Sequence, residues 1–218
     1  MELKKQQKFI YDTAEFVRKF FSQNTDGHDW WHTYRVWQLS LKIRKEEKQG
    51  DHFIIETESL LHDIDDWKLT GKTKLVNAEK WLSAHKIEKK FCNHIFQDIK
   101  NISYKGAYVS DDVLSLEGKI VQDADRLDAM GAIGIARAFA YGGSKHRILF
   151  DPEARPNMHK SFSEYQNSDG STIHHFYEKL LLLKDRMNTE TARNMADQRH
   201  QFMKNFLKQF NKEWNVKE

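Results

Sequence analysis

The sequence predicts an all-α fold, on the basis of three observations. Apolar residues recur at helical spacing through most of the chain, no segment alternates apolar and polar residues as a half-buried strand does, and short polar or glycine-containing stretches separate the apolar segments. The chain has 218 residues, 39% of them hydrophobic and 31% charged, which is ordinary for a globular protein. Residues 1–218 are therefore predicted to form a single domain.

The N-terminal half is predicted to consist of successive helices. A phenylalanine-rich first segment ends before the turn-forming residues 24–27, and in the second segment Trp31, Val36 and Ile43 are among the apolar positions. A polar loop around Gly71 follows the third helix. The first predicted helix ends at about residue 23. The next four are predicted to span residues 28–49, 53–65, 76–85 and 88–102.

The longest apolar-periodic segment, residues 114–140, is predicted to be one helix. Its small, apolar run Ala132–Ala136 predicts a helix that is buried on every side, in the middle of a helical bundle. The glycines of Tyr141–Gly143 are expected to end this helix in a left-handed C-cap. Residues 144–171 contain both prolines and show little periodicity, so they are interpreted as a long irregular lid loop.

Two C-terminal helices, residues 172–187 and 191–214, complete the predicted fold. Their apolar residues recur at helical spacing and are expected to face inward. These residues are Phe176, Leu180, Leu183, Phe202, Phe206 and Phe210.

Charge and cysteine content restrict the classes of function. The net charge is +3, from 35 basic and 32 acidic side chains, so general attraction to nucleic acid or to an anionic membrane is not indicated. Cys92 is the only cysteine, which excludes an internal disulfide and a thiolate zinc cluster. The N-terminus is charged and no apolar run is long enough to cross a bilayer, so a cytoplasmic location is predicted.

One stretch, Leu60–Trp67, places an imidazole and three carboxylates at the end of an apolar helix. Adjacent residues of a helix diverge by only about 100°, so His62 and Asp63 can face one cation. Two further apolar segments carry comparable groups, Gly27–Trp37 upstream and Val121–Ala129 downstream. These three clusters together predict a metal site.

The order His, His-Asp, Asp on three separate helices resembles the HD-domain superfamily of metal-dependent phosphohydrolases. Longer motifs are similar to the small bacterial HD hydrolases of the YpgQ/YedJ type along nearly the whole chain. The resemblance implies a helical HD bundle and hydrolysis of phosphate esters or anhydrides. The motifs are His-Asp-Trp-x-His-x-x-Arg-Val, His-Asp-Ile-Asp-Asp-Trp-Lys, Asn-Ile-Ser-Tyr-Lys-Gly-Ala and Gln-Asp-Ala-Asp-Arg-Leu-Asp-Ala-Met-Gly-Ala-Ile-Gly-Ile-Ala-Arg.

By this resemblance the metal ligands are His32, His62, Asp63 and Asp125. Asp125 matches the family's Ala-Asp-x-Leu motif; Asp128, one turn further on, is either a supporting partner or the ligand itself. Such nitrogen and oxygen ligands suit one divalent ion, Mn²⁺ or Mg²⁺, with other first-row metals as alternatives. The metal-site core then spans about residues 24–142, followed by the lid loop and C-terminal helices at about 172–215.

No second metal is expected, because Asn93 and His94 on the 88–102 helix are interpreted as packed or solvated. The resemblance places an acid/base carboxylate at Asp66, with Asp65 as the second candidate.

His28 and Asp29 share the helix face of His32 and are interpreted as residues that support this ligand or line the pocket. Arg35, one turn after His32, either anchors a phosphate or pairs with a ligand carboxylate.

Binding of a nucleoside triphosphate, the substrate that the resemblance favours, requires several positively charged side chains, and two regions of the sequence supply candidates. Lys105 follows a predicted helix, and the lid loop carries cations that are expected to close over phosphates and exclude water. On the C-terminal helices, His175, Lys179 and Arg186 share a face and either bind substrate or form salt bridges. The loop cations are Lys145, His146, Arg147 and Arg155.

The resemblance favours cleavage of (deoxy)nucleoside triphosphates to monophosphate and pyrophosphate. A nucleoside 5′-monophosphatase, a cyclic-nucleotide phosphodiesterase and a non-catalytic metal- or nucleotide-binding module are the alternatives. The expected partner is a phosphorylated small molecule, in particular a nucleotide. No nucleic acid or membrane partner is expected, and the chain is predicted to be a monomer or a homodimer.

Overall fold

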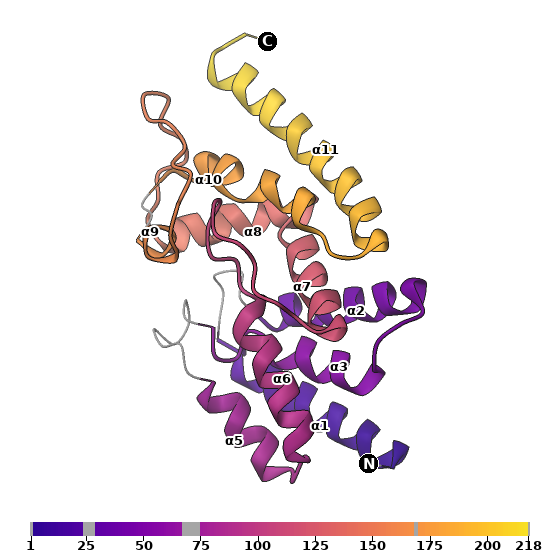
Figure 1. Ribbon diagram of the computed structural model, residues 1–218. Coiled ribbons are helices and arrows are strands. Elements are labelled where there is room, and N and C mark those ends of the chain that lie inside the picture. The colour runs from indigo at the N-terminus through magenta and orange to yellow at the C-terminus, as the bar shows by residue number, and fades with distance from the viewer. Residues whose placement is uncertain (1, 24–28, 67–74, 168–169, 218) are drawn as a thin grey trace. The chain divides into compact units, whose positions relative to one another are not determined.

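The computed structural model describes residues 2–23, 29–66, 75–167 and 170–217 (Figure 1). Within these ranges all regular structure is helical and no strand occurs, which confirms the all-α prediction. The predicted turn at 24–27, the loop around Gly71 and the candidate residue His28 lie outside the described residues.

The chain divides into two compact units. The first unit comprises residues 1–104 and 111–124, and the second comprises residues 105–110 and 125–218. The division falls inside helix α7, Leu116–Asp128, so this helix contributes residues to both units.

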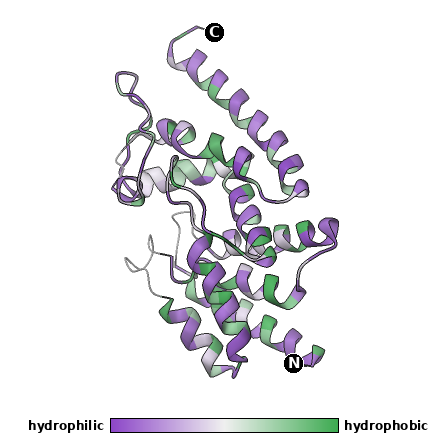
Figure 2. Ribbon diagram, in the orientation of Figure 1, coloured by the Kyte–Doolittle hydropathy of each residue, from purple (hydrophilic) through white to green (hydrophobic). Residues whose placement is uncertain are grey.

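The first unit is built around α3, His52–Leu61, which packs against α1, α2 and α6. Nearly all residues of α3 are buried, because neighbouring helices cover most of its circumference. Hydrophobic and hydrophilic residues alternate along the surrounding helices (Figure 2). They span Leu3–Phe20 (α1), Trp30–Glu47 (α2), Val76–Ala84 (α5) and Lys89–Ile102 (α6).

The second unit contains α8, α10, the 3₁₀ helix η1 and α11. The long α11 packs against α8 and η1. Helix α10 also contacts α8 and η1. The short α9 lies within the predicted lid loop. The elements span Gly131–Ser144 (α8), Phe162–Gln166 (α9), Thr172–Glu178 (α10), Leu180–Arg186 (η1) and Glu190–Trp214 (α11).

The prediction of one helix over residues 114–140 is wrong, because the chain breaks between α7 and α8. Gly131 has a φ of +70°, in the left-handed region that favours glycine, and it starts the second helix. Gly134 approaches so closely that an added Cβ would lie 2.2 Å from the carbonyl oxygen of Ala129. The glycines of this segment therefore shape a sharp helix–helix junction.

The predicted burial of Ala132–Ala136 on all sides is also wrong, since Ile133 is 45% exposed. The expected glycine C-cap is wrong as well: α8 continues through Gly142 to Ser144. A Cβ on Gly142 would lie 2.2 Å from Oγ1 of Thr172, the first residue of α10. This glycine allows close helix packing, and its small size, not a left-handed conformation, is what the position requires.

The C-terminal region differs from the prediction in two places. The predicted helix 172–187 is interrupted at Lys179, where α10 gives way to η1, although Phe176 and Leu183 are fully buried as expected. On α11, Phe202 is 52% exposed and Met203 is buried instead, so the inward face is displaced by one residue from the predicted stripe.

Two predictions for the N-terminal half also need correction. The third helix ends at Leu61, before the His-Asp pair, and not at residue 65. On α2, Val36 and Ile43 are fully buried, but Trp31 is 59% exposed.

The described part of the predicted lid loop is irregular except for α9, as expected. It is held to its own unit by backbone hydrogen bonds. The amide of Thr172 donates to the carbonyl of Ile148 at 3.1 Å, and that of Tyr108 donates to the carbonyl of His159 at 3.1 Å. The loop is thus anchored at both of these points.

Candidate metal centre

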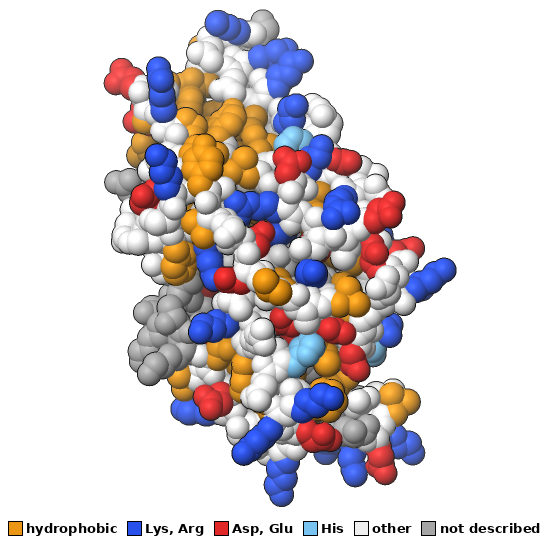
Figure 3. All heavy atoms as spheres, viewed as in Figure 1, with side chains coloured by type: hydrophobic (Ala, Val, Ile, Leu, Met, Phe, Trp, Pro, Cys, Tyr) orange, Lys and Arg blue, Asp and Glu red, His pale blue; other side chains and the backbone are white. Residues whose placement is uncertain are grey.

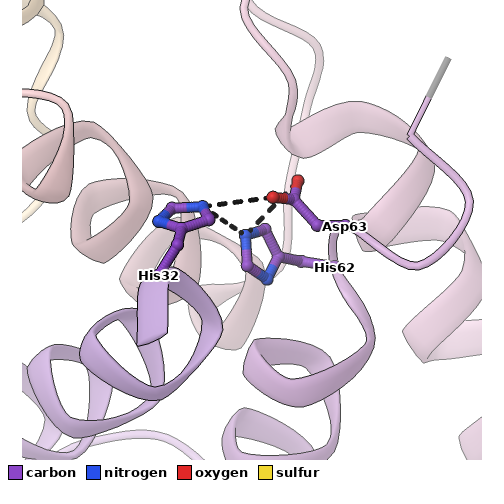
Figure 4. A group of neighbouring side chains, drawn as sticks. All are labelled: His32, His62 and Asp63. Carbon is purple, nitrogen blue, oxygen red and sulfur yellow. Dashed lines mark hydrogen bonds and ion pairs between the residues drawn. The ribbon is translucent and has the colours of Figure 1, made fainter. Parts of the chain in front are cut away.

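His32, His62 and Asp63 come together in the first unit (Figure 4). Nε2 of His32 lies 3.1 Å from Oδ2 of Asp63 and 3.4 Å from Nε2 of His62. Nε2 of His62 lies 3.5 Å from Oδ1 of Asp63. All three side chains are buried, so their polar atoms face one another in surroundings largely shielded from water.

Local structure places each of these side chains. His32 lies in the first turn of α2, where the carboxylate of Asp29 caps the helix and accepts a hydrogen bond from the His32 amide at 2.7 Å. His62 and Asp63 follow α3 in a tight turn in which the amide of Asp66 donates to the carbonyl of Asp63 at 3.0 Å. Asp29 therefore supports the position of His32 through the backbone.

The donor atoms fit a divalent cation. Nδ1 of His62 lies 2.8 Å from the carbonyl oxygen of Ser59, an acceptor that requires the ring proton on Nδ1 and leaves the Nε2 lone pair directed at the cluster. Two imidazole nitrogens and one carboxylate form a mixed set that suits first-row divalent metals. A cation between these atoms would take its ligands from the imidazole nitrogens and the carboxylate in their deprotonated forms.

The two following acids have different surroundings. Asp66 is buried and accepts a hydrogen bond from the Ser103 hydroxyl at 3.1 Å. Asp65, also buried, accepts hydrogen bonds from the backbone amides of Asn77 and Ala78, each at 2.9 Å, and from the side-chain amide of Asn77 at 2.8 Å. Asp65 therefore caps the N-terminus of α5.

The candidate ligands of α7 lie at the start of the second unit. Asp125 is half-buried. Asp128 is buried, and its Oδ2 lies 3.1 Å from Nη1 of Arg137 in an ion pair. Burial lowers the pKa of the nearby Arg199, and the negative charge of Asp128 opposes that shift. Asp128 thus balances positive charge within its own unit.

The candidate phosphate-binding cations occupy several places. Arg35 is half-buried in the first unit, whereas Lys105 and the other candidates belong to the second unit. Lys145 and Arg147 lie over the same aromatic ring, that of Tyr141, at 5.6 and 5.7 Å from its centroid.

The remaining cations of the second unit are not gathered at that ring. Lys179 lies 5.8 Å from the ring centroid of Tyr165, and Arg155 is exposed. Arg186 donates to the carbonyl of Ala107 at 2.6 Å. Positive and negative side chains are interspersed on the face shown in Figure 3.

Ser103 is the site residue that sequence reasoning did not single out. It lies directly after α6 and within the motif Asn-Ile-Ser-Tyr, so the motif itself was the available signal. Its hydrogen bond to Asp66 joins positions 37 residues apart in the chain, a contact that spacing alone does not predict.

A helical chain with a buried His and His-Asp cluster has the features of the HD-domain superfamily. The sequence model of the HD-domain family matches residues 30–130, a range that contains all four candidate metal ligands. The chain belongs to this superfamily of hydrolases and is a metal-dependent phosphohydrolase.

Within the superfamily the chain is similar to YpgQ of Bacillus subtilis. The two sequences are 39% identical over 201 residues, which cover 91% of this chain and 90% of YpgQ. The crystal structure of YpgQ in complex with ADP matches with a TM-score of 0.76 and 36% identity, covering 96% of each chain.

Two other crystal structures are similarly related. An HD-superfamily hydrolase from Bacillus thuringiensis is 39% identical, with a TM-score of 0.72 and coverage of 96% of this chain and 98% of the other. A protein from Lactobacillus plantarum is 33% identical, with a TM-score of 0.86 and coverage of 95% and 97%. Among the described residues, no helix is both long enough and apolar enough to span a membrane.

Proposed function

We propose that this chain hydrolyses (deoxy)nucleoside triphosphates to the monophosphate and pyrophosphate. The buried cluster of His32, His62 and Asp63 is the observation that carries the proposal. The complex of YpgQ with ADP supports a nucleotide as the substrate. A divalent ion held by these side chains would lower the pKa of bound water and neutralise phosphate oxygens, which is the chemistry that attack on phosphorus requires.

Asp125 is proposed as the fourth ligand. The carboxylate of Asp128, the alternative, is already engaged in the ion pair with Arg137. We further propose that the two units act as a single HD domain, since the superfamily match at residues 30–130 runs across the division between them. Mn²⁺ or Mg²⁺ is the proposed ion.

Asp66 is proposed as the acid/base group. It follows the ligand Asp63 in the same turn, and its hydrogen bond from Ser103 fixes the carboxylate. In this role one oxygen orients the attacking water and accepts its proton, and the protonated carboxyl can then return the proton to the leaving oxygen. Asp65 is given no catalytic part, because its oxygens cap α5.

Phosphate binding is assigned to cations on both units. Arg35 is on the same helix as His32, one turn further on, and is proposed to bind the phosphate nearest the centre. Lys145 and Arg147, held at the Tyr141 ring, are proposed to bind the outer phosphates. Lys105, Arg155 and Lys179 complete the proposed set.

Product analysis tests the reaction. The full chain is stripped of metal, reloaded with Mn²⁺ or Mg²⁺, and incubated with nucleoside mono-, di- and triphosphates and cyclic nucleotides. Chromatography of the nucleotides and separate assays of phosphate and pyrophosphate identify the bond that is cleaved. Asp63→Ala removes a ligand, and Asp197→Asn, at a 59% exposed side chain, is the matched control.

Monophosphate plus pyrophosphate, lost in Asp63→Ala and retained in Asp197→Asn, supports the proposal. Nucleoside plus phosphate overturns it in favour of a monophosphatase, and opening of a cyclic nucleotide overturns it in favour of a phosphodiesterase. No product with either metal overturns it in favour of a binding module.

A further inference from the structure

A second cluster of acidic and imidazole side chains lies within the first unit. Glu58 comes from α3, and His94 and Asp98 come from α6. One possible ligand atom of each side chain lies within 4.8 Å of the others. Glu117, in the first turn of α7, approaches Nε2 of His94 at 3.5 Å. The four side chains share no residue with the centre described above.

Glu58 is the unusual member of this cluster. Its side chain is fully buried, and neither carboxylate oxygen has a hydrogen-bond donor. Nε2 of His94 lies 3.9 Å from Oε1 of Glu58. A buried, ionised carboxylate without a donor is energetically unfavourable unless it binds a cation or takes up a proton. His94 is therefore the ionisable nitrogen that the structure pairs with this carboxylate, and it lies beyond hydrogen-bond distance.

Asp98, in contrast, is fixed by the protein. The backbone amide of Ser115 donates to Oδ1 at 3.0 Å, and the Ser115 hydroxyl donates to Oδ2. Gly118 makes room for this arrangement, because a Cβ there would lie 2.5 Å from Cγ of Asp98. The carboxylate of Asp98, on α6, is therefore held in place by residues at and just before the start of α7.

His94 connects the cluster to solvent. Its side chain is 33% exposed, and Nε2 lies 3.4 Å from Oδ2 of Asp98 and 3.1 Å from the Ser115 hydroxyl. One imidazolium carries a single positive charge, whereas Glu58, Asp98 and Glu117 carry three negative charges when ionised. Burial raises the pKa of Glu58 well above its usual value, and the charge of Asp98, a hydrogen bond between the protonated Glu58 and Asp98, and the charge of Glu117 add to this shift.

We propose that Glu58, His94 and Asp98 bind a divalent metal ion, with Glu117 beside it at the solvent side. Two or three carboxylate oxygens with one imidazole nitrogen favour Mn²⁺ or Zn²⁺ over Ca²⁺, which prefers oxygen ligands only. The three ligands come from α3 and α6, so the ion cross-links these two helices of the first unit. Its role is to stabilise this unit.

Metal stoichiometry tests the site. The full chain is stripped of metal and dialysed against Mn²⁺ over a concentration series, and bound metal per chain is measured by elemental analysis. Two ions per chain are expected for the wild type. One ion is expected for Glu58→Gln, which removes the charge but keeps the shape, and one for Asp63→Ala. The control Asp197→Asn is expected to keep two.

A second variant keeps the proposal testable if Glu58→Gln does not fold. His94→Ala alters a partly exposed side chain and is also expected to bind one ion. Retention of two ions by either variant overturns the proposal, as does a wild type whose single ion is lost in Asp63→Ala and kept in Glu58→Gln. The readout is a metal count, so it stands apart from the hydrolytic activity proposed above.

Discussion

The two clusters of the first unit differ in how their buried polar atoms are satisfied. In the first, His32, His62 and Asp63 lie within 3.5 Å of one another, and the carbonyl of Ser59 orients one imidazole. In the second, Glu58 is buried without a donor. Helix α3 carries Glu58 in its last full turn, and His62 directly follows the helix. The comparison shows that the first cluster brings its candidate ligand atoms into mutual contact, whereas the second contains a buried carboxylate that a bound ion or a proton would neutralise.

The largest predicted effect is a loss of activity on substitution in the turn that carries His62 and Asp63. Asp66→Asn is expected to lower kcat by about 10²- to 10⁴-fold, because the amide cannot accept the proton of the attacking water. Bound metal per chain is expected to stay at the wild-type value. Steady-state kinetics and elemental analysis measure the two quantities.

Asp65→Asn is the matched control for that change. It alters the adjacent acid of the same turn, whose role is to cap α5, so about 1 kcal/mol of unfolding free energy should be lost with kcat nearly unchanged. If the two substitutions lower kcat equally, the separate roles assigned to Asp66 and Asp65 are wrong.

An intermediate effect is expected at the second cluster. Gly118→Ala places a Cβ 2.5 Å from Cγ of Asp98, so either this carboxylate or α7 must shift. We predict a loss of about 1–3 kcal/mol in unfolding free energy, typical of overpacking. Urea denaturation measures it. Gly143→Ala is the control, because apart from its chain neighbours and the backbone of its own helix no atom lies within 4 Å of a Cβ at that position.

The smallest effect is a change in the pH dependence of stability in metal-free protein. The raised pKa of Glu58 means that the folded state binds its proton more tightly than the unfolded state, whose carboxyl has the ordinary value of 4.5. Stability is therefore expected to fall as pH rises above 4.5, by the linkage between proton binding and folding.

Glu58→Gln should remove this decline, and the melting temperature measured from pH 4 to pH 8 compares the two proteins. Mn²⁺ added to the wild type at the upper end should restore stability if the ion replaces the proton. Parallel pH curves for the wild type and Glu58→Gln would contradict the assignment.

Much of the fold follows from local patterns in the sequence, and its failures have identifiable causes. Helical spacing predicts α5 and α6 to within about a residue, because their apolar faces repeat regularly. Apolar periodicity does not predict the break before Gly131, because the apolar pattern continues across it and the φ of +70° is a backbone property that the pattern does not encode. The position of Phe202 depends on the rotation of α11 against α8, which is set by tertiary packing.

The sequence predicts the first cluster better than the second. The His-Asp pair is adjacent in the chain and belongs to a motif, so the proximity of His62 and Asp63 was predictable. Glu58 lies inside an apolar helix and meets His94 from 36 residues away, and neither residue belongs to a sequence motif that indicates a metal site. Only the packing of α3 against α6 brings them together.

The cap that Asp65 provides couples two elements that look independent in the sequence. Because the turn after α3 holds the first amides of α5, any ligand that tightens this turn also opposes fraying of the next helix. Cation loading at His62 and Asp63 should therefore slow amide hydrogen exchange at Asn77 and Ala78. The start of α5 would then report occupancy of the metal centre without contacting the ion.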